Sequence, residues 1–185
     1  MQTYLEVDVG INRDFCWYKT LRETLKHYRV KWQYGFYHIT IAFIDENPNR
    51  QNLIPIFEDV LRGTTAPIIA FDKINAFKAY RRKEYIISLT STEVPDSLIA
   101  LVESVRNSLK SVGCVLKSDF KLHVTLGRLD ATAADLQDLN ELINQVDLTP
   151  FRQALTDFNF RVKSRDHKLL YSIKLSLPEG LTYES

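Results

Sequence analysis

Two stretches, YHITIAF at residues 37–43 and LHVTLGR at residues 122–128, follow nearly the same pattern. In each, a histidine and the threonine two positions after it alternate with apolar residues, and the two histidines are 85 positions apart. Alternation with a period of two is typical of a half-buried β-strand, because successive side chains point to opposite faces. Each stretch therefore predicts a strand with one apolar face and one face that presents an imidazole and a hydroxyl.

The alternation also assigns residues to the polar face. Three residues are expected there in each strand: His38, Thr40 and Ala42 in the first, and His123, Thr125 and Gly127 in the second. The histidine and the threonine of one strand are then about 7 Å apart, and the small third residue is expected to leave room for a ligand. Arg128 falls on the apolar face by alternation, and a bend at Gly127 would turn it towards the polar face.

The order of predicted elements around the two stretches repeats as well. Each half of the chain is predicted to run helix, His-x-Thr strand, helix, strand, basic tip and strand. The predicted helices cover residues 14–28, 53–61, 95 to about 113 and 132–146, with Asp14 and Thr132 as N-caps of the first and the last. The predicted strands cover residues 3–10, 37–44, 66–80, 84–91, 121–129, 154–163 and 169–177, and the basic tips are Arg81–Lys83 and Arg165–Lys168.

This repeat predicts an α+β fold in one bilobal domain spanning residues 1–185. The lobes are expected to cover about residues 1–92 and 93–185 and to be related by a pseudo-twofold axis. Each lobe is expected to be an antiparallel sheet with helices on its outer face, and the two lobes are expected to face each other. The sequence leaves open an exchange of strands between the lobes.

Composition excludes several classes of protein. The chain has 185 residues, of which 45% are hydrophobic, enough to bury a core without disulfides. Its formal net charge of +1 gives no global field for long nucleic acid, so contact with nucleic acid is expected to be local. Two cysteines without a Cys-x-x-Cys motif favour a reducing, cytoplasmic location. We expect no signal peptide, no contact with a membrane and a monomeric protein.

In this frame the pair of motifs resembles the 2H phosphoesterase superfamily, and it is most similar to the RNA 2',3'-cyclic phosphodiesterases, also called 2'-5' RNA ligases. The likeness extends over nearly the whole chain through its length, the order of its elements and the spacing of the motifs. It implies a bilobal fold with a central cleft and without a metal or another cofactor. It implies His38 and His123 as the catalytic pair and Thr40 and Thr125 as phosphate-binding residues. The implied substrate is a 2',3'-cyclic phosphate at an RNA 3' end or on a small nucleotide.

The residue types suit this chemistry on their own account. Opening a cyclic phosphodiester requires that one proton leaves water and another reaches the departing oxygen, and histidine can do either near neutral pH. Threonine hydroxyls can donate to the non-bridging phosphate oxygens, and we expect Arg128 to be an auxiliary anion binder. The sequence does not assign the base and the acid between the two histidines, nor the 2'- or 3'-phosphate as the product.

Other functions stay open at this point. The chain could act on a different nucleotide phosphodiester, such as ADP-ribose cyclic phosphate, a 2'-5' oligoadenylate or a cyclic oligonucleotide. It could also be a non-catalytic nucleotide-binding or RNA-binding module, or a structural protein. No metal site is expected, because the sequence has neither His-Glu-x-x-His nor His-x-His with acidic partners.

Several further residues are candidates for contact with the substrate. His27 is expected near a helix C-terminus and His167 in a solvated hairpin tip, although the tips would meet the rest of a nucleotide if they reach the cleft. Four aromatic residues flank the motifs and are expected either in the core or stacked on a base: Tyr34, Phe36, Tyr37 and Phe120.

Overall fold

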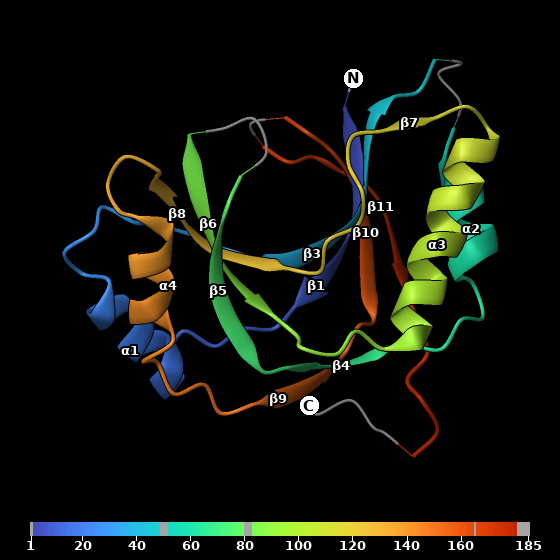
Figure 1. The fold of residues 1–185 in the computed structure, drawn as a ribbon. Helices are drawn as coiled ribbons and strands as arrows, with labels where there is room; N and C mark the ends of the chain where they lie inside the picture. The colour runs from blue at the N-terminus through green and yellow to red at the C-terminus, as the bar shows by residue number, and fades with distance from the viewer. Residues whose placement is uncertain (1, 49–51, 80–82, 165, 181–185) are drawn as a thin grey trace.

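The strands of the protein form one large antiparallel sheet and one small sheet (Figure 1). The computed structural model describes residues 2–48, 52–79, 83–164 and 166–180. The strands of the large sheet are β1 (Thr3–Val9), β2 (Lys31–Trp32), β3 (Tyr37–Glu46), β5 (Lys73–Lys78), β6 (Glu84–Thr90), β7 (Val115–Leu116), β8 (Val124–Asp130), β10 (Asp157–Val162) and β11 (Leu169–Lys174). The small sheet pairs β4 (Ile68–Phe71) with β9 (Phe151–Ala154). The predicted α+β class with antiparallel sheets is confirmed.

The two motif strands meet in the middle of the large sheet. Its order is β11-β10-β1-β3-β8-β6-β5, with β2 paired to β8 and β7 paired to β3. Strands β3 and β8 pair at one position, where Ile39 lies opposite Val124. We therefore call β11-β10-β1-β3 the first-motif wing and β8-β6-β5 the second-motif wing.

Each wing contains strands from both halves of the sequence. In the first-motif wing, β1 pairs with β3 on one side and with β10 on the other. In the second-motif wing, β8 from the second half of the chain pairs with β6 from the first half. In both wings, a strand from the first half of the chain is therefore hydrogen-bonded to a strand from the second half.

The helices of the described residues lie outside the two wings (Figure 1). They are α1 (Cys16–Thr24), α2 (Ile54–Leu61), α3 (Asp96–Ser111) and α4 (Leu136–Ile143). Helices α2 and α3 contact each other, α2 contacts β11 and α3 contacts β3, whereas α4 contacts β5 and α1. Each wing thus has its own pair of covering helices.

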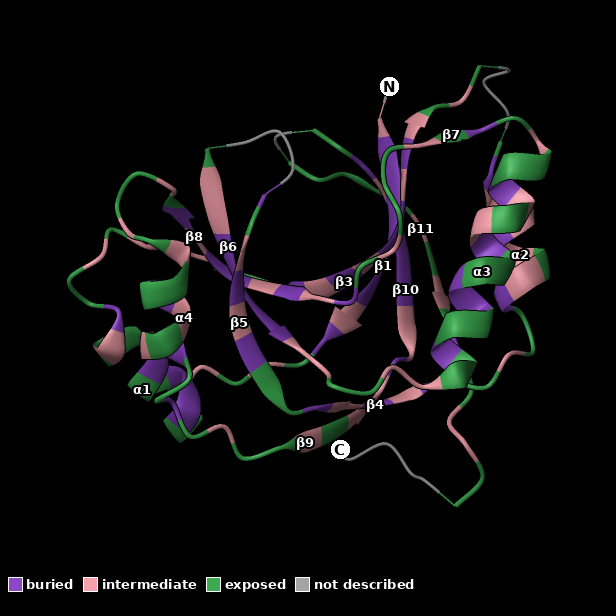
Figure 2. Ribbon diagram, viewed as in Figure 1, coloured by how far each residue is buried: buried purple, intermediate pink, exposed green. Residues whose placement is uncertain are grey.

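The covering helices are amphipathic, as their apolar spacing predicts. In α3 the buried side chains recur every three or four residues, which places them on one face. They are Leu98, Leu101, Val102, Val105 and Leu109. Buried segments of the helices therefore face the sheet while exposed segments face outwards (Figure 2).

Both predicted N-caps are wrong by one or more residues. Helix α1 begins at Cys16 after Phe15, and Asp14 forms an ion pair with Lys19 instead of capping. Helix α4 begins at Leu136, and the Asp135 carboxylate accepts from the amides of the second and third helical residues. A cap must stand directly before the first helical residue, so Asp135 fulfils this role and the earlier Thr132 does not.

Two predicted strands are broken in the structure. The predicted strand 66–80 divides around Asp72 into β4 and β5, so that β4 can pair with β9 below the large sheet. The predicted strand 154–163 begins as β10 only at Asp157. The segments on either side of each break are buried in one connected core. The apolar alternation in the sequence therefore continues across the breaks and does not reveal them.

Candidate active site

The register between β3 and β8 places the two His-x-Thr motifs on one face of the sheet. Because Ile39 lies opposite Val124 in an antiparallel pair, His38 is the neighbour of Thr125 and Thr40 is the neighbour of His123. Ile39 and Val124 are fully buried on the other face. Diagonal neighbours in such a pair are about 7–8 Å apart, and this is the relation between the two histidines.

The two imidazoles are close enough for the charge of one to act on the other. The positive charge of His123 is the second largest cause, after burial, that lowers the pKa of His38. Charges interact in this way only over short distances in a partly buried site. The fold therefore brings together the four residues that the sequence singled out: His38, Thr40, His123 and Thr125.

Each motif strand contains a β-bulge directly after its threonine. Thr40 lies opposite Glu6 but Ala42 lies opposite Leu5, so β3 carries one extra residue there. In β8 the same shift occurs after Thr125, which lies opposite the next strand's Ser88. A bulge of one residue reverses the alternation that follows it.

The bulges remove the two small residues from the polar face. Ala42 is buried with 1% of its surface exposed, and Gly127 is buried as well. A Cβ atom on Gly127 would lie 2.7 Å from Cγ1 of Val30 and 3.2 Å from the Trp32 ring. The prediction that these small residues leave room for a ligand is therefore wrong, and Gly127 makes room for the segment that carries Val30 and Trp32.

The bulges also bring a new residue of each strand onto the polar face. Phe43 lies opposite Tyr4, and Arg128 lies opposite Ile86. The charge of Arg128 lowers the pKa of both His38 and His123, and its Nη1 lies 3.9 Å from Oε2 of Glu84. The bend expected at Gly127 is thus a bulge, and it places Arg128 beside the motif histidines.

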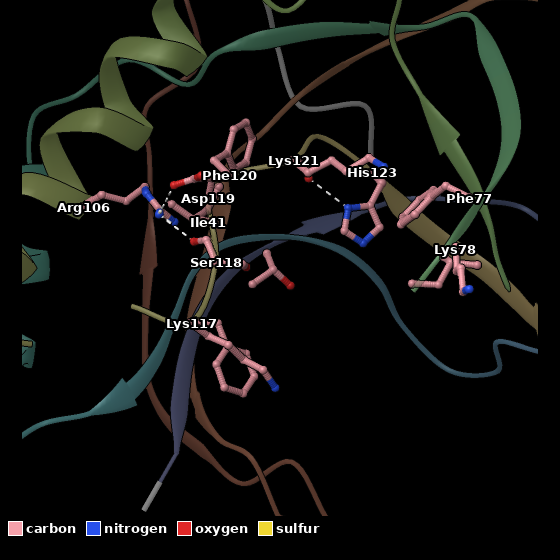
Figure 3. A pocket seen from close by; sticks show the side chains of 13 residues that line it. Ile41, Phe77, Lys78, Arg106, Lys117, Ser118, Asp119, Phe120, Lys121 and His123 are labelled. Atoms are coloured by element: carbon pink, nitrogen blue, oxygen red, sulfur yellow. Dashed lines mark hydrogen bonds and ion pairs between the residues drawn. The ribbon is translucent and has the colours of Figure 1, made fainter. Parts of the chain in front are cut away.

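A cavity of about 580 Å³ opens beside Thr40 and His123 (Figure 3). Its lining residues are Thr40, Ile41, Phe43, Phe77, Lys78, Ile86, Arg106, Lys117, Ser118, Asp119, Phe120, Lys121 and His123. Four of these are cationic, one is acidic and three are phenylalanines. Neither His38 nor Thr125 lines this cavity, so it extends from the motifs towards the 117–121 segment.

His123 is held by the main chain at the edge of this cavity. Its Nδ1 lies 2.9 Å from the carbonyl oxygen of Lys121, and since a carbonyl only accepts, Nδ1 carries the proton (Figure 3). The Phe77 ring meets the imidazole edge-on at 5.3 Å, and Nζ of Lys121 lies 3.3 Å from the centre of that ring. Burial lowers the pKa of His123, the hydrogen bond opposes this, and the charges of Lys121 and Arg128 lower it further.

His38 lies in a more highly charged environment. Its Nε2 lies 3.5 Å from Oε2 of Glu6, and Nε of Arg161 donates to Oε1 of the same carboxylate at 2.5 Å. The centre of the Phe36 ring lies 5.4 Å from the centre of the His38 imidazole. Burial, together with the positive charges of His123, His167, Arg161 and Arg128, lowers the pKa of His38 to about 4.

Glu6 is a site residue that the sequence reading missed. It alternates with Leu5 and Val7, a pattern typical of a half-buried strand with one exposed face, yet no part of Glu6 is exposed. Burial raises its pKa to about 7 in spite of the hydrogen bond and the charge of Arg161. The sequence carries no signal for this burial, because a strand shows which residues share a face and not what covers that face.

The second hairpin tip reaches the edge of the site. Nδ1 of His167 lies 2.8 Å from the Tyr4 hydroxyl, and Nη1 of Arg161 donates to the His167 carbonyl at 3.1 Å. His167 is exposed, as expected, but it is bonded to the first-motif wing. Arg165 of this tip, and Arg81 and Arg82 of the first tip, lie outside the described residues.

The other side chains predicted as candidates for substrate contact lie either in the core or at the surface. Tyr37 is buried and its hydroxyl lies 3.0 Å from that of Tyr18, whereas Tyr34 is exposed. Phe120 lines the cavity. His27 is exposed and lies three residues beyond the end of α1.

The part of the chain that the structure describes lacks two further features. No group of three or more His, Cys, Asp or Glu residues there could hold a metal ion. No helix among the same residues has the length and apolarity needed to cross a membrane.

Comparison with known proteins agrees with this architecture. Escherichia coli LigT, solved with 3'-AMP, has a TM-score of 0.55 and 18% identity over 94% of this chain and 97% of its own. TT0787 of Thermus thermophilus has a TM-score of 0.63 and 14% identity over 96% of this chain and 99% of its own. Kluyveromyces marxianus Usb1 with uridine monophosphate has a TM-score of 0.61 and 8% identity over 94% of this chain and 98% of its own. These likenesses concern the fold.

The sequence itself gives the family. A search of curated protein sequences found no match. The sequence profile of the 2'-5' RNA ligase superfamily matches residues 18–167, which is most of the chain and includes both His-x-Thr motifs. The protein therefore belongs to the 2'-5' RNA ligase superfamily, the 2H phosphoesterases.

Proposed function

We propose that the protein is a metal-independent cyclic phosphodiesterase that opens a 2',3'-cyclic phosphate on an RNA end or a small nucleotide. The observation that carries this proposal is the register of Ile39 with Val124, because it places both His-x-Thr motifs on one face. Two imidazoles at diagonal positions can act on opposite sides of one phosphorus, as an in-line displacement requires. Positioned acid–base help of this kind contributes about 10²–10⁴-fold to a rate.

The two histidines are proposed to have different roles. Because a charge on His123 disfavours a charge on His38, the two imidazoles are not expected to be cationic at the same time. The hydrogen bond from Nδ1 to the Lys121 carbonyl favours the protonated form of His123, and the pKa of His38 is lowered to about 4. We therefore assign His123 as the acid that protonates the leaving oxygen through Nε2 and His38 as the base that takes a proton from water.

The surroundings of the motifs suit a nucleotide. Thr40 and Thr125 would donate to the non-bridging oxygens, and Arg128 would offset the charge that builds on them. The neighbouring cavity combines Lys78, Arg106, Lys117 and Lys121 with phenylalanine rings, a combination that attracts an anion and accepts a flat base. LigT solved with 3'-AMP and Usb1 solved with uridine monophosphate support a nucleotide ligand.

Hydrolysis of nucleoside 2',3'-cyclic phosphates in the presence of EDTA tests the proposal, with ³¹P NMR identifying the product. Wild-type protein is expected to turn over, and His38→Ala and His123→Ala are each expected to lose about 10²–10⁴-fold in kcat. Arg128→Ala is expected mainly to raise KM. His27→Ala, which changes an exposed histidine beyond the end of α1, serves as the matched control.

Two results would reject the proposed reaction. Turnover that stops with EDTA and returns with a divalent ion would indicate metal-dependent chemistry. Tight binding of cyclic and linear nucleotides without turnover of any of them would make the protein a nucleotide-binding module. Activity confined to ADP-ribose cyclic phosphate, 2'-5' oligoadenylates or cyclic oligonucleotides would keep the two-histidine chemistry and change the substrate.

A further inference from the structure

The two motif histidines differ in how the sheet holds their main chain. His38 lies inside β3 and is paired with Asp8 of β1. His123 precedes β8, which begins at Val124, and the described register of β6 with β8 ends where Leu89 lies opposite Val124. The sheet therefore fixes the position of His38 directly, whereas His123 depends on other contacts.

Thr90 supplies such a contact one residue beyond the last strand pair. It is the last residue of β6, and its hydroxyl donates to the Leu122 carbonyl at 2.9 Å. Its own main chain stays in the sheet, because Thr90 pairs with Lys73 of β5 and its carbonyl accepts from the Asp72 amide at 3.2 Å. A β-branched side chain is stiff. The Thr90 hydroxyl therefore ties the residue before His123 to a fixed strand.

The peptide next to this hydrogen bond is the one that holds the imidazole. The Lys121 carbonyl accepts from Nδ1 of His123 at 2.9 Å, and Lys121 directly precedes Leu122. Figure 3 shows this hydrogen bond, with the second ring nitrogen of His123 on the side away from Lys121. The Lys121 and Leu122 carbonyls belong to peptide groups that share one Cα atom, so a shift of the second would move the first.

Other hydrogen bonds hold the same segment farther from His123. Nη2 of Arg106 donates to the Ser118 carbonyl at 2.7 Å, and the Lys117 amide donates to the Phe43 carbonyl at 2.9 Å. Both lie at the start of the segment, whereas the bond from Thr90 lies at its end, beside the imidazole.

We propose that Thr90 is a positioning residue for His123: its hydroxyl holds Leu122 so that the Lys121 carbonyl keeps the Nδ1 proton and Nε2 stays directed at the leaving oxygen. This inference rests on the proposed function and deepens it by naming what aims the acid. During the reaction the bond from phosphorus to one ribose oxygen breaks, and that oxygen takes the Nε2 proton of the imidazolium. The Nδ1 proton stays on the ring, bonded to the Lys121 carbonyl.

Thr90 acts without a charge of its own. Burial lowers the pKa of His123, the hydrogen bond to the Lys121 carbonyl raises it, and the charges of Lys121 and Arg128 lower it. The charged and titratable groups around His123 are Lys121, Lys78 of β5, Arg128 of β8 with its partner Glu84 of β6, and His38 of β3. Removing the Thr90 hydroxyl alters none of these charges, so a fall in the pKa of His123 would report the weakened hydrogen bond.

The kinetic test compares wild type with Thr90→Val, which keeps the branched shape and loses the donor. For a nucleoside 2',3'-cyclic phosphate, kcat is expected to fall about two- to tenfold, the worth of one hydrogen bond. KM is expected to change little, because the bond acts on proton transfer. Thr90→Ser restores the hydroxyl and is expected to recover most of kcat. Thr64→Val, which removes a hydroxyl that donates to the Val60 carbonyl at 3.0 Å, is the matched control and is expected to behave like wild type.

¹⁵N NMR of the imidazole groups tests the same role without turnover. Neutral His123 is expected to carry its proton on Nδ1 in wild type, and in Thr90→Val to divide it between both nitrogens and to titrate at a lower pKa. An inactive wild type that shows this difference would reject the proposed reaction and keep the role of Thr90.

Three results would overturn the role of Thr90. One is a proton on Nε2 of neutral His123 in wild type, a measurement that needs no variant to fold. Another is a Thr90→Val protein with the kcat and the ring signals of wild type. The third is a Thr90→Ser protein as impaired as Thr90→Val, because the hydroxyl would then not be the group that matters.

Discussion

The two wings share a framework and differ in their chemistry. In both motif strands the His-x-Thr pair is followed by a bulge, and the bulge turns a later residue of the strand onto the polar face. In the first-motif wing this last residue is Phe43 and the neighbouring strand supplies Glu6, whereas in the second-motif wing they are Arg128 and Ser88. A repeated backbone thus places two histidines alike, and the residues around them make their proton affinities different.

Among the substitutions that compare the two wings, the largest effect is expected from removing one motif hydroxyl at a time. Thr40→Val and Thr125→Val keep the shape of the side chain, and loss of a donor to a charged phosphate oxygen costs about 10²–10³-fold in kcat. We expect the larger loss for Thr40→Val, because Thr40 lines the cavity with His123 and Thr125 does not. Steady-state kinetics on a 2',3'-cyclic nucleotide measures both.

Equal losses in the two valine variants would instead mean that the phosphate sits symmetrically between the wings. Wild-type kcat in either variant would remove that hydroxyl from the phosphate site. Thr64→Val is a suitable control, since this threonine donates to the Val60 carbonyl at the end of α2, away from the motifs.

The next largest effect concerns the two bulges. Gly127→Ala places a Cβ atom 2.7 Å from Val30, and such overpacking lowers the free energy of unfolding by about 1–3 kcal/mol. Ala42→Gly in the other bulge adds no atom, and its cost is expected to stay below about 1 kcal/mol. Urea unfolding of both variants measures the difference.

The double variant Gly127→Ala with Val30→Ala separates the clash from other effects. If the close approach of Val30 is the cause, the second substitution recovers part of the lost stability. A Gly127→Ala protein as stable as wild type would show that the two bulges tolerate the same residues.

The smallest effect, taken per pH unit, is the pH dependence of stability at the Glu6 position. The pKa of Glu6 is raised from 4.5 to about 7 in the folded protein, so its contribution is fully present below about pH 4.5 and is lost as the pH rises through 7. Stability of wild type relative to Glu6→Gln is therefore expected to fall over this range, by no more than about 1.4 kcal/mol per pH unit. Urea unfolding at several pH values measures this difference.

The opposite sign is expected for His38, whose pKa is lowered from 6.5 to about 4. Its contribution to stability is present above about pH 6.5 and is lost as the pH falls through 4. The two contributions partly cancel in wild type between about pH 4.5 and 6.5. Ser88→Ala, at the equivalent neutral position, should differ from wild type by the same amount at every pH, and a pH-dependent difference there would contradict this account.

The sequence by itself determined the elements that depend on local pattern. Alternation predicted the motif strands, spacing of three and four predicted the helices, and two similar motifs in similar frames predicted the α+β class and the family. It also pointed to His38, Thr40, His123 and Thr125, because their side chains share a face in any regular strand. Helix ends and strand breaks were less well predicted, as at Asp135 and Asp72, because they depend on a few local hydrogen bonds and on distant pairing.

Only the tertiary structure decided how the strands combine and what surrounds the histidines. Pairing of β1 with β10 and of β3 with β8 joins residues more than 80 positions apart, and local pattern carries no information about such partners. The bulges reversed the alternation, so that Phe43 and Arg128 replaced Ala42 and Gly127 on the polar face. Glu6 became a buried partner of His38 because Arg161, from the far end of the chain, arrived on its other side. The reason is that burial and charge pairing depend on which segments meet, and the fold sets this.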